Sequence, residues 1–179
     1  MRTLDIILSL IGLILLFPLM FLVYILNLMI YGSPLFFQER IGYNLKIFTL
    51  VKFRTMKIGT RNAATHLIDK KSITVFGKLL RTLKIDELPQ LWNVLIGEMS
   101  IVGPRPCLVT QKKLINERYK RGVFKMKPGI TGLSQIKGVT MSNPILLAKT
   151  DFQMMKKMSL INYFCYIFLT LSPVIKLKL

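Results

Sequence analysis

The chain has 179 residues, a length that suits one compact domain rather than two. Its 26 lysine and arginine residues stand against 8 aspartate and glutamate residues, a net charge of +18, yet 52% of its residues are hydrophobic. Disordered basic segments combine high charge with low hydrophobicity, so this composition excludes disorder as the main state and indicates a protein at a negatively charged membrane surface.

The sequence offers little cysteine or histidine chemistry. Cys107 and Cys165 are far apart and belong to no metal-binding cluster, which excludes a disulfide framework and a structural zinc site. We expect both to be packing residues in a reducing cytoplasm. The single histidine, His66, lies in a polar stretch and is expected at the surface. Any catalysis must therefore use carboxylates, basic groups and the backbone.

The N-terminal region is long and apolar. No charged residue lies between Asp5 and Glu39, and residues 6–31 exceed the ~20 residues that cross a bilayer core. Pro18, near the middle, removes a backbone donor and predicts a bend. The residues alone leave two alternatives: an ordinary spanning helix, which they favour, and a re-entrant hairpin. Residues 40–84 include eleven lysines and arginines, so the positive-inside rule places the following domain in the cytoplasm.

Residues 35–56 predict a turn followed by a strand at 47–53, because the second part is rich in β-branched and aromatic residues. Alternation along this strand places Lys52 and Arg54 on one face and Phe53 on the other. Residues 57–71 are polar and basic, which is typical of a loop.

Apolar residues at helical spacing then predict two helices, at 76–83 and at 88–95, the second ending at Gly97. A sharp turn is expected at 99–106, a polar helix at 108–120 and a loop at 128–132, the last because of its glycines and proline. Residues 160–175 carry no charge and predict an interfacial or core helix.

Two adjacent carboxylates, Asp86 and Glu87, lie between the two predicted helices, with Arg81 and Lys84 nearby. We expect Asp86 to cap the second helix, and the helix dipole and nearby cations to favour its ionised form. Such a carboxylate is a usable nucleophile or metal ligand, and Mg²⁺ can bridge it to a phosphate at the helix N-terminus. The alternative, which is favoured for these residues taken alone, is an ordinary helix start.

Basic residues near these carboxylates are candidates for phosphate binding. Arg105 stands between Pro104 and Pro106, which restrict its backbone and hold a guanidinium suited to bidentate phosphate binding. Lys52 and Arg54 either bind phosphate or, as their spacing alone favours, face lipid headgroups. No Walker loop and no GxGxxG is present, which weighs against ordinary nucleotide triphosphate or dinucleotide binding.

Three segments occur in order behind the apolar N-terminus: LVKFRTM, GKLLRTLKIDELPQLWNVLIGEMSIVGPRP and KPGITGLSQI. Together they resemble the monotopic phosphoglycosyl transferases, also called bacterial sugar transferases. The resemblance implies transfer of a sugar-1-phosphate from a UDP-sugar to polyprenol phosphate, with release of UMP. It also implies Mg²⁺, a covalent phosphosugar-aspartate intermediate and a re-entrant N-terminal helix, so it favours the hairpin over the spanning helix.

The resemblance also implies roles for individual residues. Asp86 matches the nucleophilic aspartate and Glu87 its acidic partner, and these two would hold the metal. The positions matched to substrate binding are Arg105, Lys52, Arg54, Arg81, Gln135 and Asp151. The chain differs from the family pattern at Phe17, where serine is usual, at Leu133, where an aromatic residue is usual, and at Val139, where arginine is usual.

The expected fold is α+β and mainly helical, with a proline-broken re-entrant helix at residues 1–34 and a small strand element. Residues 35–179 would form a cytoplasmic catalytic domain with interfacial C-terminal helices, on the inner membrane of a bacterium. The alternatives are a membrane-tethered basic binding module for nucleic acid or anionic lipid, and an inactive relative that serves as a scaffold. No RNA- or DNA-binding signature is present, so no nucleic-acid partner is expected, and no pattern indicates an oligomeric state.

Overall fold

A computed structural model describes residues 1–60 and 69–171 of the chain, so His66 and the predicted helical residues after Leu171 lie outside the described part. The architecture is α+β and mainly helical, as predicted. Its helices and strands, in chain order, are α1 (Arg2–Tyr31), β1 (Leu35–Ile41), β2 (Ile47–Phe53), α2 (Val75–Thr82), α3 (Gln90–Leu95), β3 (Ser100–Val102), β4 (Cys107–Leu108), α4 (Lys112–Lys120), β5 (Gly129–Thr131), α5 (Leu133–Ile136), α6 (Pro144–Lys156) and α7 (Leu160–Leu171).

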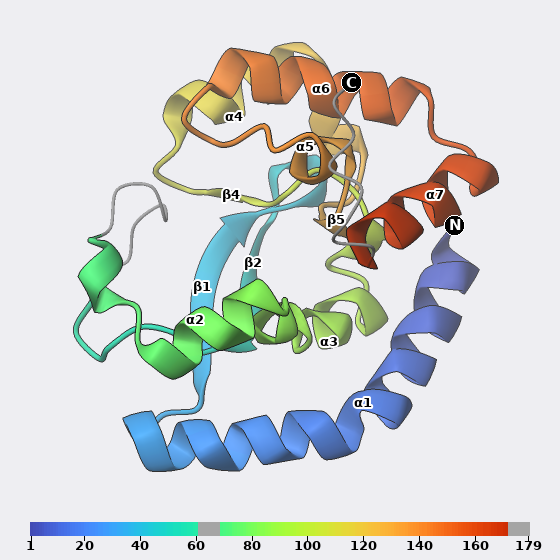
Figure 1. Ribbon diagram of the computed structural model, residues 1–179. Coiled ribbons are helices and arrows are strands. Elements are labelled where there is room, and N and C mark those ends of the chain that lie inside the picture. The colour runs from blue at the N-terminus through green and yellow to red at the C-terminus, as the bar shows by residue number, and fades with distance from the viewer. Residues whose placement is uncertain (61–68, 172–179) are drawn as a thin grey trace.

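The N-terminal apolar segment forms one continuous helix, α1, that passes through Pro18. Figure 1 shows that α1 changes direction partway along its length, and a proline inside a helix causes such bends. By length and composition α1 could cross a membrane. The helix therefore continues through the proline, and its re-entrant path through a membrane stays a prediction.

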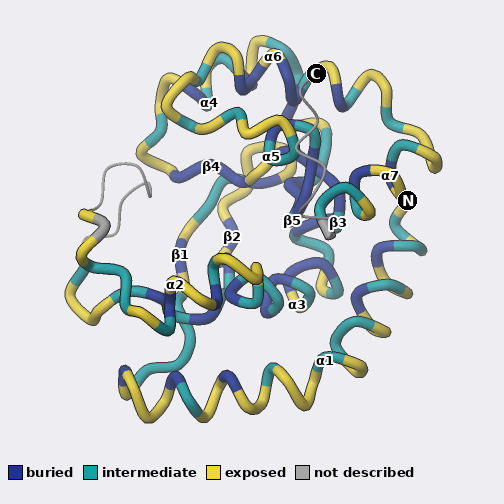
Figure 2. The backbone as a smooth tube through the Cα atoms, in the orientation of Figure 1, coloured by how far each residue is buried: buried dark blue, intermediate teal, exposed yellow. Residues whose placement is uncertain are grey.

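Helix α1 has polar residues on its buried face and large apolar residues on its exposed face, which is the reverse of a surface helix in a soluble protein. Its buried residues include Asp5, Ser9 and Asn27, which face the rest of the protein. The exposed residues are large and apolar, and Figure 2 shows the outer side of α1 as mostly exposed; the most exposed are Ile14, Leu15, Phe17 and Met29. A contiguous exposed apolar face of this kind is expected where a helix contacts lipid.

Strands β2, β1 and β4 form an antiparallel sheet in that order. Strand β2 has the predicted bounds, but β1 was not predicted, because its sequence LFFQERI lacks clean alternation and continues the apolar run before it. In the register, Phe36 lies opposite Lys52 and Arg40 lies opposite Phe48, so Arg40 and Lys52 share one face of the sheet. Phe53 is buried on the other face, as predicted.

The predicted loop at 128–132 is wrong, because Gly129–Thr131 is strand β5, which pairs in parallel with β3. The glycines in this segment allow two backbones to approach closely rather than making a loop. A Cβ at Gly129 would lie 2.0 Å from the Gly103 nitrogen, and a Cβ at Gly103 would lie 2.3 Å from the Lys127 carbonyl oxygen. Only glycine at both positions permits this pairing.

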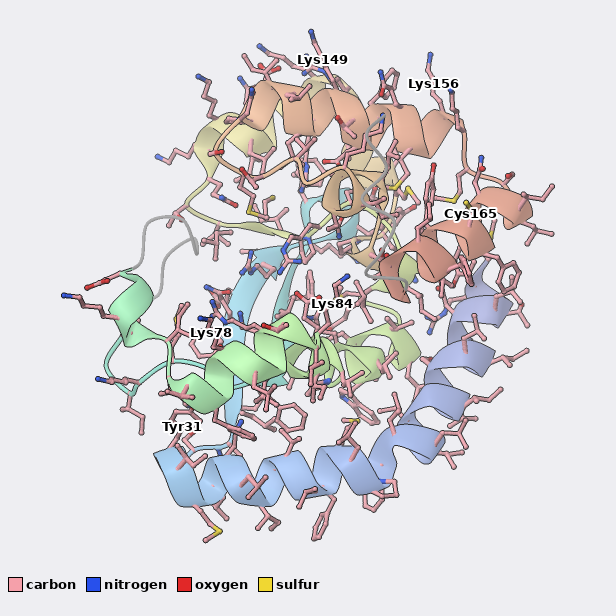
Figure 3. The ribbon with its side chains drawn as sticks, in the orientation of Figure 1. Tyr31, Lys78, Lys84, Lys149, Lys156 and Cys165 are labelled. Carbon is pink, nitrogen blue, oxygen red and sulfur yellow. The ribbon has the colours of Figure 1, made fainter. Side chains whose placement is uncertain are left out.

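The helices agree more closely with the sequence. Helices α2 and α3 occupy the two predicted segments, while the polar helix begins at Lys112 rather than 108, because Cys107 and Leu108 pair with β1 as strand β4. Helix α6 was not predicted, and α7 occupies the described part of the predicted apolar helix. Cys107 is fully buried as expected, but Cys165 is exposed on α7 (Figure 3), so its predicted packing role is wrong.

The helices divide the interior into regions on either side of the sheet. Figure 1 shows α2 and α3 between the sheet and the second half of α1, with α4 and α6 at the opposite side of the molecule. One core cluster joins β2 to α3 through Phe48, Leu50, Val94 and Met99. A second joins α1 to α2 through Val23, Phe53 and Leu80, and so fixes α2 against α1.

Candidate functional site

The two adjacent carboxylates lie in a short 3₁₀ helix, Ile85–Glu87, between α2 and α3. Lys84 precedes it with a left-handed backbone (φ 57°), which turns the chain out of α2. Asp86 is 7% exposed, and the Glu87 side chain is 17% exposed. The turn therefore presents a largely buried carboxylate beside a second one.

The expected capping role of Asp86 is wrong, and the expected stabilisation of its charge by nearby cations is present but outweighed by burial. Helix α3 has Pro89 at its N-cap and no side-chain cap, so Asp86 does not cap it. The pKa of Asp86 is raised to about 6 rather than lowered, first because burial penalises the charged form and then because Glu87 adds a like charge. Lys52, Arg81 and Arg105 lower it again in part, so the carboxylate is still ionised at neutral pH.

Four basic side chains from different parts of the chain surround this pair: Arg40 on β1, Lys52 on β2, Arg81 on α2 and Arg105 in the turn after β3. Burial, followed by the charges of Arg40 and Arg105, lowers the pKa of Lys52 to about 8. Burial, followed by the charge of Arg105, lowers the pKa of Arg40 to about 10. Four cations beside the two carboxylates leave a surplus of positive charge, an arrangement that favours an anionic ligand.

Arg105 closes the site opposite the 3₁₀ helix. Its guanidinium Nη2 lies 2.7 Å from Glu87 Oε1, and its side chain remains 44% exposed. The charge of Glu87 raises the pKa of Arg105. An arginine that is both fixed at one end and open to solvent can still bind a phosphate.

The side chains of Arg81 and Arg54 form hydrogen bonds that link neighbouring segments, in addition to carrying charge. Arg81 Nε donates to Thr55 Oγ1 at 2.8 Å. Arg54 donates to the Ser33 carbonyl at 2.9 Å and to the Leu35 carbonyl at 3.1 Å, which ties the end of α1 to β1. Lys52 and Arg54 both lie over the Phe36 ring, at 5.3 and 5.7 Å from its centroid, so the prediction that they share a face is confirmed.

Asp151 and Gln135 lie apart from this cluster. Asp151 is fully buried and pairs with Arg118 of α4, Oδ2 to Nη2 at 2.7 Å, while the Ser134 hydroxyl donates to its other oxygen. Gln135 Nε2 donates weakly to the Ile130 carbonyl at 3.4 Å, and its Oε1 is buried without a hydrogen-bond partner among the described residues. The structure therefore brings together Asp86, Glu87, Arg105, Lys52 and Arg81 but not these two residues.

Two of the three departures from the family pattern, Leu133 and Val139, are accounted for by packing. Leu133 packs against the cluster of Val102, Met154, Tyr163 and Tyr166, and Val139 packs against the cluster that contains Cys107 and Leu147. Phe17 is exposed on α1 and stacks with Phe21. At positions 133 and 139 the chain has apolar side chains that contribute to the core.

Two arginines of the site region, Arg40 and Arg118, were not predicted from the sequence. Arg40 lies in the strand that was not predicted, and Arg118 lies in a polar helix where one more arginine carries no signal. No local feature of β1 distinguishes Arg40, because the polar residues Gln38 and Glu39 directly precede it.

Carboxylates for a metal are few. Among the described residues, no group of three or more histidine, cysteine, aspartate or glutamate side chains could hold an ion. Mg²⁺ in phosphate-transfer sites is commonly held by one or two carboxylates together with substrate phosphates and water, and Asp86 and Glu87 fit that limited donor set.

Comparison with known proteins gives a consistent result. The sequence model described as "Bacterial sugar transferase" matches residues 1–177. The chain is 49% identical over 108 residues to "Uncharacterized sugar transferase EpsL" of Bacillus subtilis, covering 60% of this chain and 53% of that protein. It is 39% identical over 155 residues to "Exopolysaccharide production protein ExoY" of Sinorhizobium fredii, covering 76% of this chain and 68% of that protein.

A longer relative carries a more specific name. The chain is 41% identical over 150 residues to "UDP-glucose:undecaprenyl-phosphate glucose-1-phosphate transferase" of Xanthomonas campestris, covering 79% of this chain but only 31% of that protein. The chain thus spans about half or less of the length of several curated relatives that it matches.

Proposed function

The chain belongs to the bacterial sugar transferase family, and on that premise we propose that it transfers a sugar-1-phosphate from a UDP-sugar to polyprenol phosphate. The relative from Xanthomonas has a name that describes this reaction for UDP-glucose. The observation that carries the proposal is the geometry around Asp86. A largely buried carboxylate that is ionised at neutral pH lies beside Glu87 and faces a cluster of cations suited to a diphosphate.

The proposed reaction has two steps at one carboxylate. In the first, an Asp86 oxygen forms a bond to the sugar-bearing phosphorus of the donor, and the bond from that phosphorus to the bridging oxygen breaks, so that UMP leaves with the electron pair. In the second, an oxygen of the lipid phosphate bonds to the same phosphorus and the Asp86–phosphorus bond breaks, which regenerates the carboxylate. Two steps allow a soluble donor and a membrane-bound acceptor to use the site in turn.

The cations have separate roles in this scheme. Arg105 is the most open of them and would bind the phosphate oxygens of the donor. Lys52 lies deeper and would neutralise the charge that develops on the leaving phosphate. Arg81, fixed by Thr55, keeps a positive charge near Asp86.

We include Mg²⁺ in the proposal as the cofactor, held by Asp86 and Glu87. The metal would supply charge neutralisation on the two phosphates of the donor. The small number of carboxylates supports a site completed by substrate and water rather than an all-protein cage.

The contacts of α1 support a re-entrant membrane helix. Near its start, Asp5 Oδ1 accepts hydrogen bonds from Ser100 Oγ at 2.8 Å and from the Tyr163 hydroxyl at 2.7 Å. Near its end, Asn27 Nδ2 donates to the carbonyls of Pro34 and Arg54, both at 3.0 Å. Both ends of the apolar helix thus contact the same domain, whereas a spanning helix would separate them by the thickness of a bilayer.

The basic domain and the apolar surface together suit the cytoplasmic face of a bacterial membrane. Helix α7 lies close to the start of α1 (Figure 1). Its Ile161, Phe164 and Phe168 are exposed, as expected for an interfacial helix. Lys149 and Lys156 point outward from α6, on the side away from the second half of α1 (Figure 3).

The test is UMP release by the purified chain in detergent, with Mg²⁺, a panel of UDP-sugars and polyprenol phosphate. We expect repeated turnover only when the lipid is present, no release by Asp86→Asn, and full release by the control Asp69→Asn. The Asp69 residue is exposed, and its carboxylate accepts a local hydrogen bond from the Lys71 amide. Salt-sensitive nucleic-acid binding that survives Asp86→Asn, with no UMP released from any donor, would contradict the proposal and favour a binding module.

A further inference from the structure

Each backbone carbonyl from Pro104 to Pro106 accepts a hydrogen bond, which fixes this turn. The Pro104 carbonyl accepts from the Gly129 amide at 3.0 Å. The Arg105 carbonyl accepts from Arg118 Nη1 at 2.8 Å, and the Pro106 carbonyl accepts from Arg40 Nη1 at 2.9 Å. Two of the three donors are arginine side chains from distant elements, α4 and β1.

The arginine that contacts the Arg105 carbonyl is held by a buried ion pair. Arg118 Nε and Nη2 both donate to Asp151 Oδ2, at 3.0 and 2.7 Å, and the Ser134 hydroxyl donates to Asp151 Oδ1. Arg118 is 2% exposed and Asp151 is fully buried. Since Asp151 occupies Nε and Nη2, the planar guanidinium directs Nη1 at the Arg105 carbonyl.

Stability alone is a weak explanation for this pair. Burying two charges costs several kcal/mol per ion, and replacing a buried pair with apolar residues of similar size is often neutral or stabilising. The Arg118 guanidinium donates a hydrogen bond to the backbone carbonyl of Arg105 in the candidate site, which an apolar residue cannot do.

We propose that Arg118, oriented by Asp151 and Ser134, is a positioning residue that fixes Arg105 through its carbonyl, with Arg40 acting on the next carbonyl in the same way. The inference rests on the proposed function, in which the Arg105 guanidinium binds the donor phosphate. Asp151 then acts on the substrate indirectly, through Arg118 and Arg105, in place of the direct substrate binding that the family resemblance implied.

Fixing the backbone of Arg105 matters because its long side chain transmits any displacement of the Cα atom to the guanidinium. Among the described residues the other end of this side chain is anchored only to Glu87, so the position of its guanidinium depends on where the backbone holds the Cα atom. A displacement of about 1 Å at a group that binds reacting atoms can cost on the order of a hundredfold in rate. The flanking prolines limit rotation about the backbone, and the two arginines limit its translation.

The test is a double-mutant cycle of Arg118→Lys with Arg105→Ala. Lysine keeps a charge for Asp151 but lacks the fork that reaches both the carboxylate and the carbonyl. We expect Arg118→Lys to lower kcat/KM for the donor by roughly tenfold to a hundredfold in the wild-type background. In the Arg105→Ala background we expect it to change kcat/KM by less than about twofold, because the residue through which it acts is gone.

A binding measurement is also needed, because the Arg105→Ala variants are expected to turn over too slowly for accurate kinetics. Isothermal titration with UMP and Mg²⁺ should show the same pattern, a weaker affinity from Arg118→Lys with Arg105 present and no change without it. The matched control is Arg121→Lys, the same substitution on the residue after α4, where the guanidinium bonds to Glu117 alone in the described part of the chain. It should leave kcat/KM and UMP affinity unchanged.

A paired variant separates positioning from folding. Arg118→Met with Asp151→Leu removes both buried charges together, so we expect an unchanged or higher Tm and the same kinetic loss as Arg118→Lys. Full activity of this stable pair, or a loss of equal size with and without Arg105, would overturn the inference. A wild-type chain and an Arg121→Lys chain that both release no UMP would instead overturn the proposed function on which it rests.

Discussion

At the scale of single residues, the site balances burial against charge. Asp86 is hidden enough for its pKa to rise to about 6, yet three nearby cations keep it from rising further. The carboxylate is therefore ionised at neutral pH but weakly solvated, and a weakly solvated carboxylate is a better nucleophile than one at the surface.

Lys52 gives a pH dependence with a definite sign. Its pKa is lowered to about 8, so its charge is present below that pH and is lost as the pH rises through it. We expect kcat/KM for the donor to fall on the alkaline side with an apparent pKa near that value, because this parameter reports groups of the free enzyme.

Substitution of Lys52 tests whether this side chain causes the alkaline decrease in kcat/KM. Lys52→Arg should remove the alkaline limb or shift it upward, since a guanidinium stays protonated. Lys78→Arg on the exposed side of α2 is the matched control and should leave the profile as it is. An alkaline limb that is identical in Lys52→Arg would show that another group titrates.

How far the site could be predicted depends on where each residue lies in the sequence. Asp86, Glu87 and Arg105 were predicted together because they lie in one continuous segment with unusual turns. Arg40 and Arg118 were not, since they reach the Pro104–Pro106 turn through long-range contacts that local patterns do not encode. The sign of the Asp86 pKa shift was missed for the same reason, because burial is a property of the fold.

At the scale of elements, glycines determine where helices and strands can meet. A Cβ at Gly77 would lie 2.1 Å from the Thr55 carbonyl oxygen, so α2 packs directly on the backbone that follows β2. This contact sets the distance between Arg81 on α2 and Lys52 on β2. Glycine here costs helix propensity but allows the two basic residues to share one site.

Gly77→Ala should therefore destabilise the protein by about 1–3 kcal/mol, because backbone atoms cannot move aside as side chains do. The measurement is thermal unfolding in detergent, with a lower Tm expected. Gly12→Ala is the control: the nearest atom to its Cβ is a flexible Leu91 methyl at 3.1 Å, and alanine favours the α1 helix. Equal Tm values for Gly77→Ala and the wild type would contradict this account of α2.

Elements with a strong local period were predicted well, and elements made by long-range pairing were not. Strand β2 and helices α2 and α3 follow their apolar spacing. Strand β5 exists because glycines allow it to pair with β3, and the same glycines indicated a loop from the sequence. Strand β4 shortened the helix after it for the same kind of reason.

At the scale of the whole molecule, polar contacts at both ends hold α1 against one domain. Arg2 donates to the Leu95 carbonyl at 2.7 Å at the end of α3, and Asp5 accepts from the Ile101 amide at 2.9 Å. Tyr31, at the other end of α1, contacts the Thr74 hydroxyl that caps α2. A spanning path would break one of these sets and leave buried polar groups unpaired.

Labelling of single cysteines tests this arrangement. In a Cys165→Ser background, which removes the exposed native cysteine, Thr3→Cys marks the start of α1 and Lys46→Cys marks the turn after β1. In intact spheroplasts, a maleimide that cannot cross the membrane should label neither position, and after permeabilisation it should label both. Labelling of Thr3→Cys alone in intact spheroplasts would indicate a spanning helix.

The most direct test of the whole account is the mass of the protein after incubation with UDP-sugars and Mg²⁺ in the absence of lipid acceptor, with rapid acid quenching. The account predicts a mass gain equal to one sugar phosphate with the correct donor, abolished by Asp86→Asn and removed from the wild type by added polyprenol phosphate. A mass gain that persists in Asp86→Asn, or catalytic UMP release with no gain in the wild type, would contradict it.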